Sequence, residues 1–407
     1  MVIPCRFCGA LLRHVFVDLG AQPLANSYLE PEALRRPESF YPLCVYVCGE
    51  CFLVQLPEEE RPEAIFSDYA YFSSYSESWL RHARLYAEAM IERFGLGSEH
   101  RVIEVASNDG YLLRWFHDAG IPVQGIEPAR NVAEAAQAAG IPTLVRFFGT
   151  ETARELPEKA DLLVGNNVLA HVPDLNDFVE GLRIALAPHG VLTMEFPHLL
   201  RLMDEDQFDT IYHEHYSYFS FLAVRKVFAA HSLAVFDVEE LPTHGGSLRI
   251  YARHQEDDSK PVEPRVIDLL AREEAAGLGS LDAYRSFAQR VGRVKRGLLR
   301  FLIQAKEEGK SIVGYGAPAK GNTLLNYCGV RTDLLDYTVD LSPHKQGRYL
   351  PGTRIPVFAP DHIRETRPDY VLILPWNLKE EIMAQMADVR SWGGKFVVAI
   401  PEVRVLE

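Results

Sequence analysis

The chain has 407 residues, of which 47% are hydrophobic and 24% charged, an ordinary composition for a soluble globular protein of two or three domains. Its formal net charge of −14 argues against broad binding to nucleic acid, although it leaves room for one local basic pocket that holds a diphosphate. No apolar run reaches the roughly 18 residues of a membrane span, and the N-terminus lacks the pattern of a signal peptide. We therefore expect a cytoplasmic protein that does not enter a membrane.

Residues 1–75 are rich in proline and cysteine, and we expect them to form a small domain of short, irregular segments. This region contains two C-x2-C turns, which together supply the four thiolates of a tetrahedral zinc site: Cys5, Cys8, Cys48 and Cys51. Cys44 precedes the second turn and is an alternative ligand, while Cys328 is expected to be a small buried residue. Four sulfurs fill the coordination sphere, so the zinc would be structural, and the alternative is a set of reduced buried cysteines.

Residues 76–255 alternate between apolar runs and helical patterns. A helix is expected over 76–95, and a hairpin at the end of the region over 234–238 and 247–252. Between them, strands are expected over 101–106, 123–127, 161–166 and 190–196, and helices over 110–119 and 175–187. Such alternation predicts a mostly parallel sheet covered by helices on both faces.

The C-terminal region, 256–407, begins within a largely polar linker over 254–264 and continues as a second alternating region. Two helical segments interrupted at Gly277 are followed by expected strands over 311–316, 335–340, 370–374 and 395–400. The fold class is therefore α/β: a small zinc-binding N-terminal domain followed by two Rossmann-like domains.

Polar residues follow the expected strands of the first α/β region where a cofactor would bind. The turn after the first strand is acidic, which suits a cofactor with an ammonium and a sulfonium better than a pyrophosphate. Glu127 ends the second strand, where a carboxylate can hold both ribose hydroxyls. The spacing resembles class I methyltransferases, which bind S-adenosylmethionine, and the alternative is a generic nucleotide or substrate site whose polar residues cap helices. The expected cofactor residues are Glu104, Ser107, Asn108, Asp109, Gly110, Glu127, Pro128, Asn166 and Asn167.

The densest chemical cluster is Tyr212-His213-Glu214-His215-Tyr216, between the strand that ends at Phe196 and an apolar helix that Ser220 can cap. Imidazole, carboxylate and phenol are the groups that move a proton beside a carbonyl. The alternatives are a helix-entry loop with surface histidines and a zinc site, but the helical H-E-x-x-H spacing is absent.

Taken in order, these motifs resemble the sugar C-3-methyltransferases, which act on dTDP-linked or similar keto-deoxysugars. The resemblance also covers His244-Gly245-Gly-Ser-Leu-Arg and Gly314-Tyr-Gly-Ala-Pro-Ala-Lys320-Gly-Asn322-Thr. It implies a zinc-binding domain (1–75), a methyltransferase domain (76–255) and a C-terminal Rossmann-like domain (256–407). It also implies His215 as general base, with Tyr212 and Glu214 beside it and His171 as a second candidate for handling protons.

The turn that ends in Lys320 follows a strand and opens a helix, so it could receive the diphosphate of a dTDP- or GDP-linked sugar; its departure from the full fingerprint disfavours NAD. The aromatic stretch 69–76 could form a lid or pack between domains. The expected substrate-binding residues are Tyr75, His244, Gly245, Lys320 and Asn322. The rival functions are methyl transfer to oxygen or nitrogen of a sugar nucleotide and a non-catalytic zinc-containing binding module, and an internal site would allow the enzyme to act as a monomer.

Overall fold

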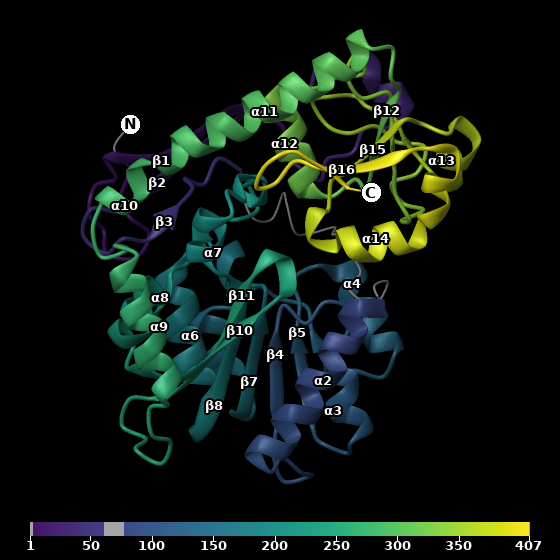
Figure 1. The fold of residues 1–407 in the computed structure, drawn as a ribbon. Helices are drawn as coiled ribbons and strands as arrows, with labels where there is room; N and C mark the ends of the chain where they lie inside the picture. Colours follow the sequence, from purple (N-terminus) through teal and green to yellow (C-terminus); the bar gives the residue numbers. More distant parts are fainter. Residues whose placement is uncertain (1–2, 61–76, 407) are drawn as a thin grey trace.

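A computed structural model describes residues 3–60 and 77–406, which build three β-sheets (Figure 1). Tyr75 and the rest of the aromatic stretch 69–76 lie outside the described residues. None of the described helices is both long enough and apolar enough to cross a membrane.

The N-terminal region forms an antiparallel sheet in the order β1-β2-β3-β9, so the expectation of irregular segments was wrong. Register shifts in β1 interrupt the period-two pattern that would have revealed this strand in the sequence. The fourth strand comes from a distant part of the chain. The strands are β1 (His14–Gln22), β2 (Tyr41–Val47), β3 (Val54–Gln55) and β9 (Ser217–Tyr218), and a 3-10 turn, η1, spans Pro31–Arg35.

The central sheet runs in the order β10-β11-β8-β7-β4-β5-β6, with parallel pairing from β8 to β6 and an antiparallel β10–β11 hairpin beside β8. The expected hairpin is thus present. The chain builds outward from β4 through β5 and β6, then returns to add β7 on the opposite side of β4. The strands are β4 (Val102–Val105), β5 (Val123–Ile126), β6 (Thr143–Leu144), β7 (Ala160–Asn166), β8 (Leu186–Pro197), β10 (Leu233–Leu241) and β11 (Ser247–His254).

Helices cover this sheet, and the expected helices over 76–95, 110–119 and 175–187 are present with slightly shorter bounds. Ser220 caps α8 as expected, because its hydroxyl accepts a hydrogen bond from the Ala223 amide at 3.1 Å. The helices are α2 (Glu77–Phe94), α3 (Leu113–Asp118), α4 (Arg130–Ala138), α5 (Thr150–Glu155), α6 (Leu175–Ala185), α7 (Leu199–Asp204) and α8 (Phe221–Ala230), with 3-10 turns η3 (Leu169–His171), η4 (Phe208–Thr210) and η5 (Thr243–Gly245).

The C-terminal sheet runs in the order β14-β13-β12-β15-β16-β17 and is parallel except for the β16–β17 pair. Its strands are β12 (Ile312–Tyr315), β13 (Thr338–Val339), β14 (Val357–Phe358), β15 (Tyr370–Ile373), β16 (Lys395–Val398) and β17 (Arg404–Leu406). The helices of this region are α9 (Pro264–Ala275), α10 (Asp282–Arg285), α11 (Phe287–Glu307), α12 (Ala319–Cys328), α13 (Asp361–Thr366) and α14 (Lys379–Gln385), with 3-10 turns η6 (Trp376–Leu378) and η7 (Ala387–Trp392).

The long helix α11 joins the N-terminal sheet to the C-terminal unit (Figure 1). The ring of Phe287 stacks on the ring of Phe16 in β1, with centroids 4.5 Å apart and planes 4° from parallel. A single hydrophobic cluster extends from β1 and β2 through α11 into the C-terminal sheet. A small sheet is stable when its apolar face packs against other elements, and α11 and the C-terminal unit supply this packing.

Candidate active site

The first part of the site lies at the carboxyl ends of β4 and β7, the point at which the strand order of the central sheet reverses. Ligands of open α/β sheets bind at such switch points. The turn after β4 is tight, with positive φ angles at Ala106 (56°), Asn108 (50°) and Gly110 (76°). The Glu127 carboxylate secures it by accepting hydrogen bonds from the amides of Asn108 (3.0 Å) and Ala129 (2.8 Å).

This edge of the sheet carries polar atoms that the protein itself does not satisfy. Among the described residues, Glu104 Oε2, Ser107 Oγ and both amide atoms of Asn166 are buried without a hydrogen-bond partner. Burial, followed by the charges of Glu127, Asp109 and Glu195, raises the pKa of Glu104 well above its usual value. A buried acidic turn with unsatisfied acceptors and donors suits a polar, positively charged cofactor. Pro128 and Asn167 flank the same edge, after β5 and β7.

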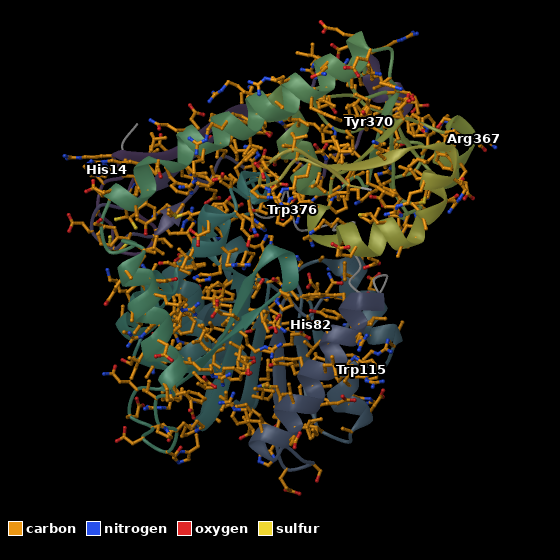
Figure 2. All side chains as sticks on the ribbon, in the orientation of Figure 1. His14, His82, Trp115, Arg367, Tyr370 and Trp376 are labelled. Carbon is orange, nitrogen blue, oxygen red and sulfur yellow. The ribbon has the colours of Figure 1, made fainter. Side chains whose placement is uncertain are left out.

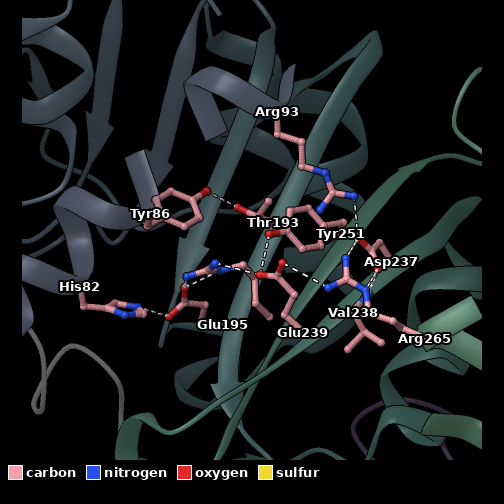
Figure 3. Close-up of polar contacts among 11 residues, drawn as sticks. His82, Tyr86, Arg93, Thr193, Glu195, Asp237, Val238, Glu239, Tyr251 and Arg265 are labelled. Atoms are coloured by element: carbon pink, nitrogen blue, oxygen red, sulfur yellow. Dashed lines mark hydrogen bonds and ion pairs between the residues drawn. The ribbon is translucent and has the colours of Figure 1, made fainter. Parts of the chain in front are cut away.

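A network of charged and polar side chains surrounds Glu195 (Figure 3). Glu195 in β8 is the register partner of Asn166. The Glu195 carboxylate binds His82 of α2 at 2.9 Å and Arg249 of β11 at 2.7 Å, and Arg249 also binds Glu239 at 3.0 Å. Burial disfavours the Glu195 carboxylate, but hydrogen bonds and charge from His82 and Arg249 outweigh this effect and lower its pKa. Glu195 therefore stays ionised one strand away from the cofactor edge.

The second part of the site is the segment 207–220, the histidine loop, which leads from η4 to α8. It carries three of the four expected catalytic residues, Tyr212, Glu214 and His215, and the fourth, His171, lies in η3. The His215 ring lies 4.1 Å from the Tyr212 ring and 4.7 Å from the His171 ring, measured between centroids. The rings of Tyr212, His215 and His171 thus lie together, and their catalytic roles stay a prediction.

The hydrogen bonds of His215 determine its tautomer. Its Nδ1 lies 2.9 Å from the carbonyl oxygen of Thr210, and a carbonyl can only accept, so Nδ1 carries the hydrogen. Burial lowers the pKa of His215 well below its usual value, and the charges of His171, His244 and Lys320 contribute. The ring is therefore neutral at physiological pH, with an unprotonated Nε2 that can accept a proton.

The side chains of Glu214 and His213 instead contact the N-terminal region. Glu214 accepts a hydrogen bond from Asn26 Nδ2 at 2.6 Å, so the N-terminal region reaches into the site. The His213 Nε2 lies 3.2 Å from the Pro42 carbonyl, in contact with the N-terminal sheet. Of the two histidines in this motif, only His215 lies against His171 and Tyr212.

The C-terminal unit faces the histidine loop with Lys320 and Trp376; Figure 2 shows Trp376 on the side of this unit that meets the central unit. Lys320 donates to Asn377 Oδ1 at 2.7 Å and lies 4.7 Å from the centre of the Trp376 ring. Burial, followed by the positive charge of Lys320, lowers the pKa of His244 to about 4. Lys320 therefore brings a positive charge to the histidine cluster, which consists of His171, His215 and His244.

Two further residues expected to bind substrate have structural contacts. Asn322 Nδ2 donates to the Ala25 carbonyl at 2.6 Å, and Gly245 lies against the Trp376 ring. The expectation that they touch the substrate stays a prediction. Asn26, Thr323 and Trp376 were not expected at the site, because their partners are more than a hundred residues away in the chain.

The four expected zinc ligands come together in the N-terminal unit, with all four sulfurs within 4.8 Å of one another. The Cys5–Cys51 and Cys8–Cys48 sulfurs are 3.6 and 3.5 Å apart. A tetrahedral zinc with bonds of about 2.3 Å would place its sulfurs about 3.8 Å apart, so the cluster fits the ion. Cys44 lies in β2 and does not belong to this cluster.

The zinc cluster also supports the active site. Arg6, between two of the ligands, donates to the Pro173 carbonyl at 2.7 Å and lies over the Tyr216 ring at 5.4 Å. Asn176 of α6 donates to the Phe7 carbonyl at 2.9 Å. The first C-x2-C turn is therefore packed against the central unit and the histidine loop.

Three family models match the chain in the order that the sequence indicates: a zinc binding domain over residues 5–66, a methyltransferase domain over 79–238 and a C-methyltransferase C-terminal domain over 242–401. The chain is also 37% identical over 405 residues to the C-methyltransferase NovU of Streptomyces niveus, which covers 99% of this chain and 96% of NovU. The chain belongs to this C-methyltransferase family. It is an S-adenosylmethionine-dependent C-methyltransferase with a class I fold and a zinc-binding N-terminal module.

Solved structures overlap with parts of the chain. The magnesium protoporphyrin IX methyltransferase of Synechocystis PCC 6803 with bound S-adenosylmethionine is 14% identical, with a TM-score of 0.34 over 42% of this chain and 78% of that one. The YcgJ protein of Bacillus subtilis is also 14% identical, with a TM-score of 0.35 over 44% of this chain and all of its own.

Replacing Cys8 with serine should lower the zinc content from about one ion per chain and reduce the melting temperature by about 5 °C or more, because zinc binding contributes folding free energy. Metal analysis and thermal unfolding would measure both. Cys44→Ser is the matched control and should retain zinc. Equal zinc loss in the two variants would contradict the assigned ligand set.

Binding of S-adenosylmethionine should release protons, and its affinity should rise with pH, over the range in which Glu104 titrates in the free enzyme. Burial, followed by neighbouring carboxylates, raises the pKa of Glu104 well above its usual value, and a cationic ligand favours the carboxylate and lowers that pKa. Calorimetry in two buffers of different ionisation enthalpy measures the release. Glu104→Gln should reduce it by about half or more, while the exposed Glu134→Gln should not; unchanged release in Glu104→Gln would contradict the assignment.

Proposed function

We propose that this enzyme methylates C-3 of a nucleotide-linked 4-keto-deoxysugar, with His215 as the base that removes the C-3 proton. The observation that carries the proposal is the tautomer of His215. Its Nδ1–H is engaged by the Thr210 carbonyl, and burial keeps the ring neutral, so Nε2 has a free electron pair. A carbon acid beside a ketone needs such a base, whereas a hydroxyl or amine acceptor needs less help.

In the proposed first step, His215 Nε2 takes the proton from the carbon beside the ketone. The electron pair of the broken C–H bond moves into an enolate, whose negative charge collects on the ketone oxygen. The Tyr212 phenol, beside the His215 ring, and the Lys320 ammonium are the groups that can stabilise this oxygen. Burial disfavours the imidazolium that forms, but the enolate beside it offsets this cost.

The residues at the ends of β4, β5 and β7 would hold the cofactor: Glu104, the turn 107–110, Glu127 and Asn166. S-adenosylmethionine bound there would supply an electrophilic methyl group, with S-adenosylhomocysteine as the other product. The carbonyl re-forms as the new carbon–carbon bond is made, and His215 returns its proton to solvent. The protein must hold both reactants in contact and exclude water.

The nucleotide diphosphate would lie towards the C-terminal unit. Lys320 is placed near the start of α12, and it faces the histidine cluster rather than open solvent. This charge supports a substrate that extends from the histidine loop to the C-terminal unit. Both dTDP and GDP remain candidates, and the same experiment that tests the reaction discriminates between them.

Purified enzyme should add one methyl mass to a dTDP- or GDP-linked 4-keto-6-deoxysugar, and in deuterated water without S-adenosylmethionine it should exchange the C-3 hydrogen. Mass spectrometry measures both. His215→Asn should lower both rates by about 100-fold or more, because general-base catalysis contributes factors of this size.

His213→Asn is the matched control, since its side chain contacts the Pro42 carbonyl, and it should keep near-normal rates. A methyl gain without hydrogen exchange would favour transfer to oxygen or nitrogen. A folded His215→Asn variant that binds cofactor and keeps full turnover would exclude His215 as the base.

A further inference from the structure

Two hydrogen bonds from the C-terminal unit reach the turn that begins the histidine loop. The indole Nε1–H of Trp376 in η6 donates to Asp209 Oδ2 at 2.7 Å. The hydroxyl of Thr323 in α12 donates to the carbonyl of Ile211 at 2.9 Å. All of these side chains are buried: Trp376 is 8% exposed, Thr323 1% and Asp209 0%.

The two bonds flank one residue, Thr210. The carbonyl of Thr210 is the acceptor that binds His215 Nδ1. Trp376 therefore holds the residue before this carbonyl, and Thr323 holds the residue after it. The turn is only a single 3-10 turn, η4, so external contacts contribute much of what fixes its orientation.

The surroundings of Trp376 are shaped to receive it. A Cβ at Gly245 would overlap the Trp376 ring, so the absence of a side chain there allows the indole to reach Asp209. Gln207 Nε2 donates to the Gly245 carbonyl at 2.7 Å, which ties the first residue of the histidine loop to the same place. The glycine-rich turn after β10 thus leaves space for the Trp376 side chain of the C-terminal unit.

The pKa of the Asp209 carboxyl depends on these contacts. Burial raises its pKa to about 6, against the opposing effects of Lys320 and the Trp376 hydrogen bond. Lys320 lies over the Trp376 ring, so the cation, the indole and the carboxylate form one packed group. Loss of the indole N–H would leave a buried carboxylate oxygen without its donor and shift the turn.

We propose that Trp376 and Thr323 are positioning residues: they fix the 209–211 turn so that the Thr210 carbonyl holds His215 in its Nδ1–H tautomer and orientation. This inference rests on the proposed role of His215 as the base. It gives the C-terminal unit a part in proton removal that is separate from any contact with the nucleotide.

The test uses Trp376→Phe, which keeps an aromatic ring but removes the donor, and Thr323→Val, which removes a hydroxyl at nearly constant volume. Each should lower kcat by about 10- to 100-fold, the size expected for a small misplacement of a catalytic group, and change the KM of either substrate by less than about threefold. C-3 hydrogen exchange without S-adenosylmethionine should fall with kcat.

Trp392→Phe is the matched control, because Trp392 also donates from Nε1 to a partner in its own unit, the Pro368 carbonyl at 3.1 Å, away from the histidine loop. It should keep kcat near the wild-type value. If Trp376→Phe does not fold, as judged by thermal unfolding, the kcat of Thr323→Val decides the test instead. Wild-type kcat in the folded variants would overturn the inference.

The decisive comparison places each substitution in a His215→Asn background. Residues that act through one base are not additive, so Trp376→Phe should cause no further loss of exchange or turnover there. An equal loss in both backgrounds would overturn the positioning role while leaving His215 as the base. Full activity of His215→Asn alone would instead overturn the proposed function itself.

Discussion

The site depends on how the backbone of the histidine loop is held, because that loop carries the proposed base but has little regular structure of its own. Each of the three units holds it. The Leu56 amide of the N-terminal unit bonds to the Tyr216 carbonyl at 3.0 Å, and the Tyr216 amide bonds to the Ala170 carbonyl of the central unit at 2.7 Å. Thr323 of the C-terminal unit binds Ile211. A reaction that needs a neutral imidazole in one orientation gains from such external support, since misplacement of a catalytic group by even about 1 Å is costly.

The zinc cluster and the long helix α11 also help to hold the histidine loop in place. The first C-x2-C turn directs Arg6 towards Pro173 and Tyr216, so the metal stabilises a surface that contacts the loop. The N-terminal sheet in turn shares its hydrophobic core with α11 and the C-terminal sheet. The N-terminal and C-terminal units thus both contact the loop and are themselves packed together, which gives a structural zinc site a part in supporting the histidine loop.

Sequence patterns within short segments predicted the features that depend on neighbouring residues in the chain. The C-x2-C spacing predicted the zinc ligands, and the alternation of strands and helices predicted the strands β4 and β7, which lie side by side and carry Glu104 and Asn166. The resemblance singled out His215, but the pattern of the motif alone did not indicate which of its histidines lies against His171. That depends on the Pro42 carbonyl, which binds His213, and on Thr210, which binds His215. The roles of Trp376 and Asn26 could not be predicted, because each donates to a partner more than 160 residues away and no periodic pattern marks such a contact. The irregular appearance of the N-terminal region was misleading for a related reason: β9, the strand that completes its sheet, lies in the histidine loop.

The protonation state of His215 is the central claim, and nitrogen NMR of histidine-labelled enzyme tests it without any sugar substrate. Comparison with His215→Asn assigns the ring. At about pH 7 the account predicts a neutral ring with the hydrogen on Nδ1, and it predicts that the ring stays neutral as the pH falls below the usual histidine value of 6.5, because burial lowers its pKa. An imidazolium at about pH 7, or a neutral ring with the hydrogen on Nε2, would contradict the account, because Nε2 would then have no electron pair to accept the proton.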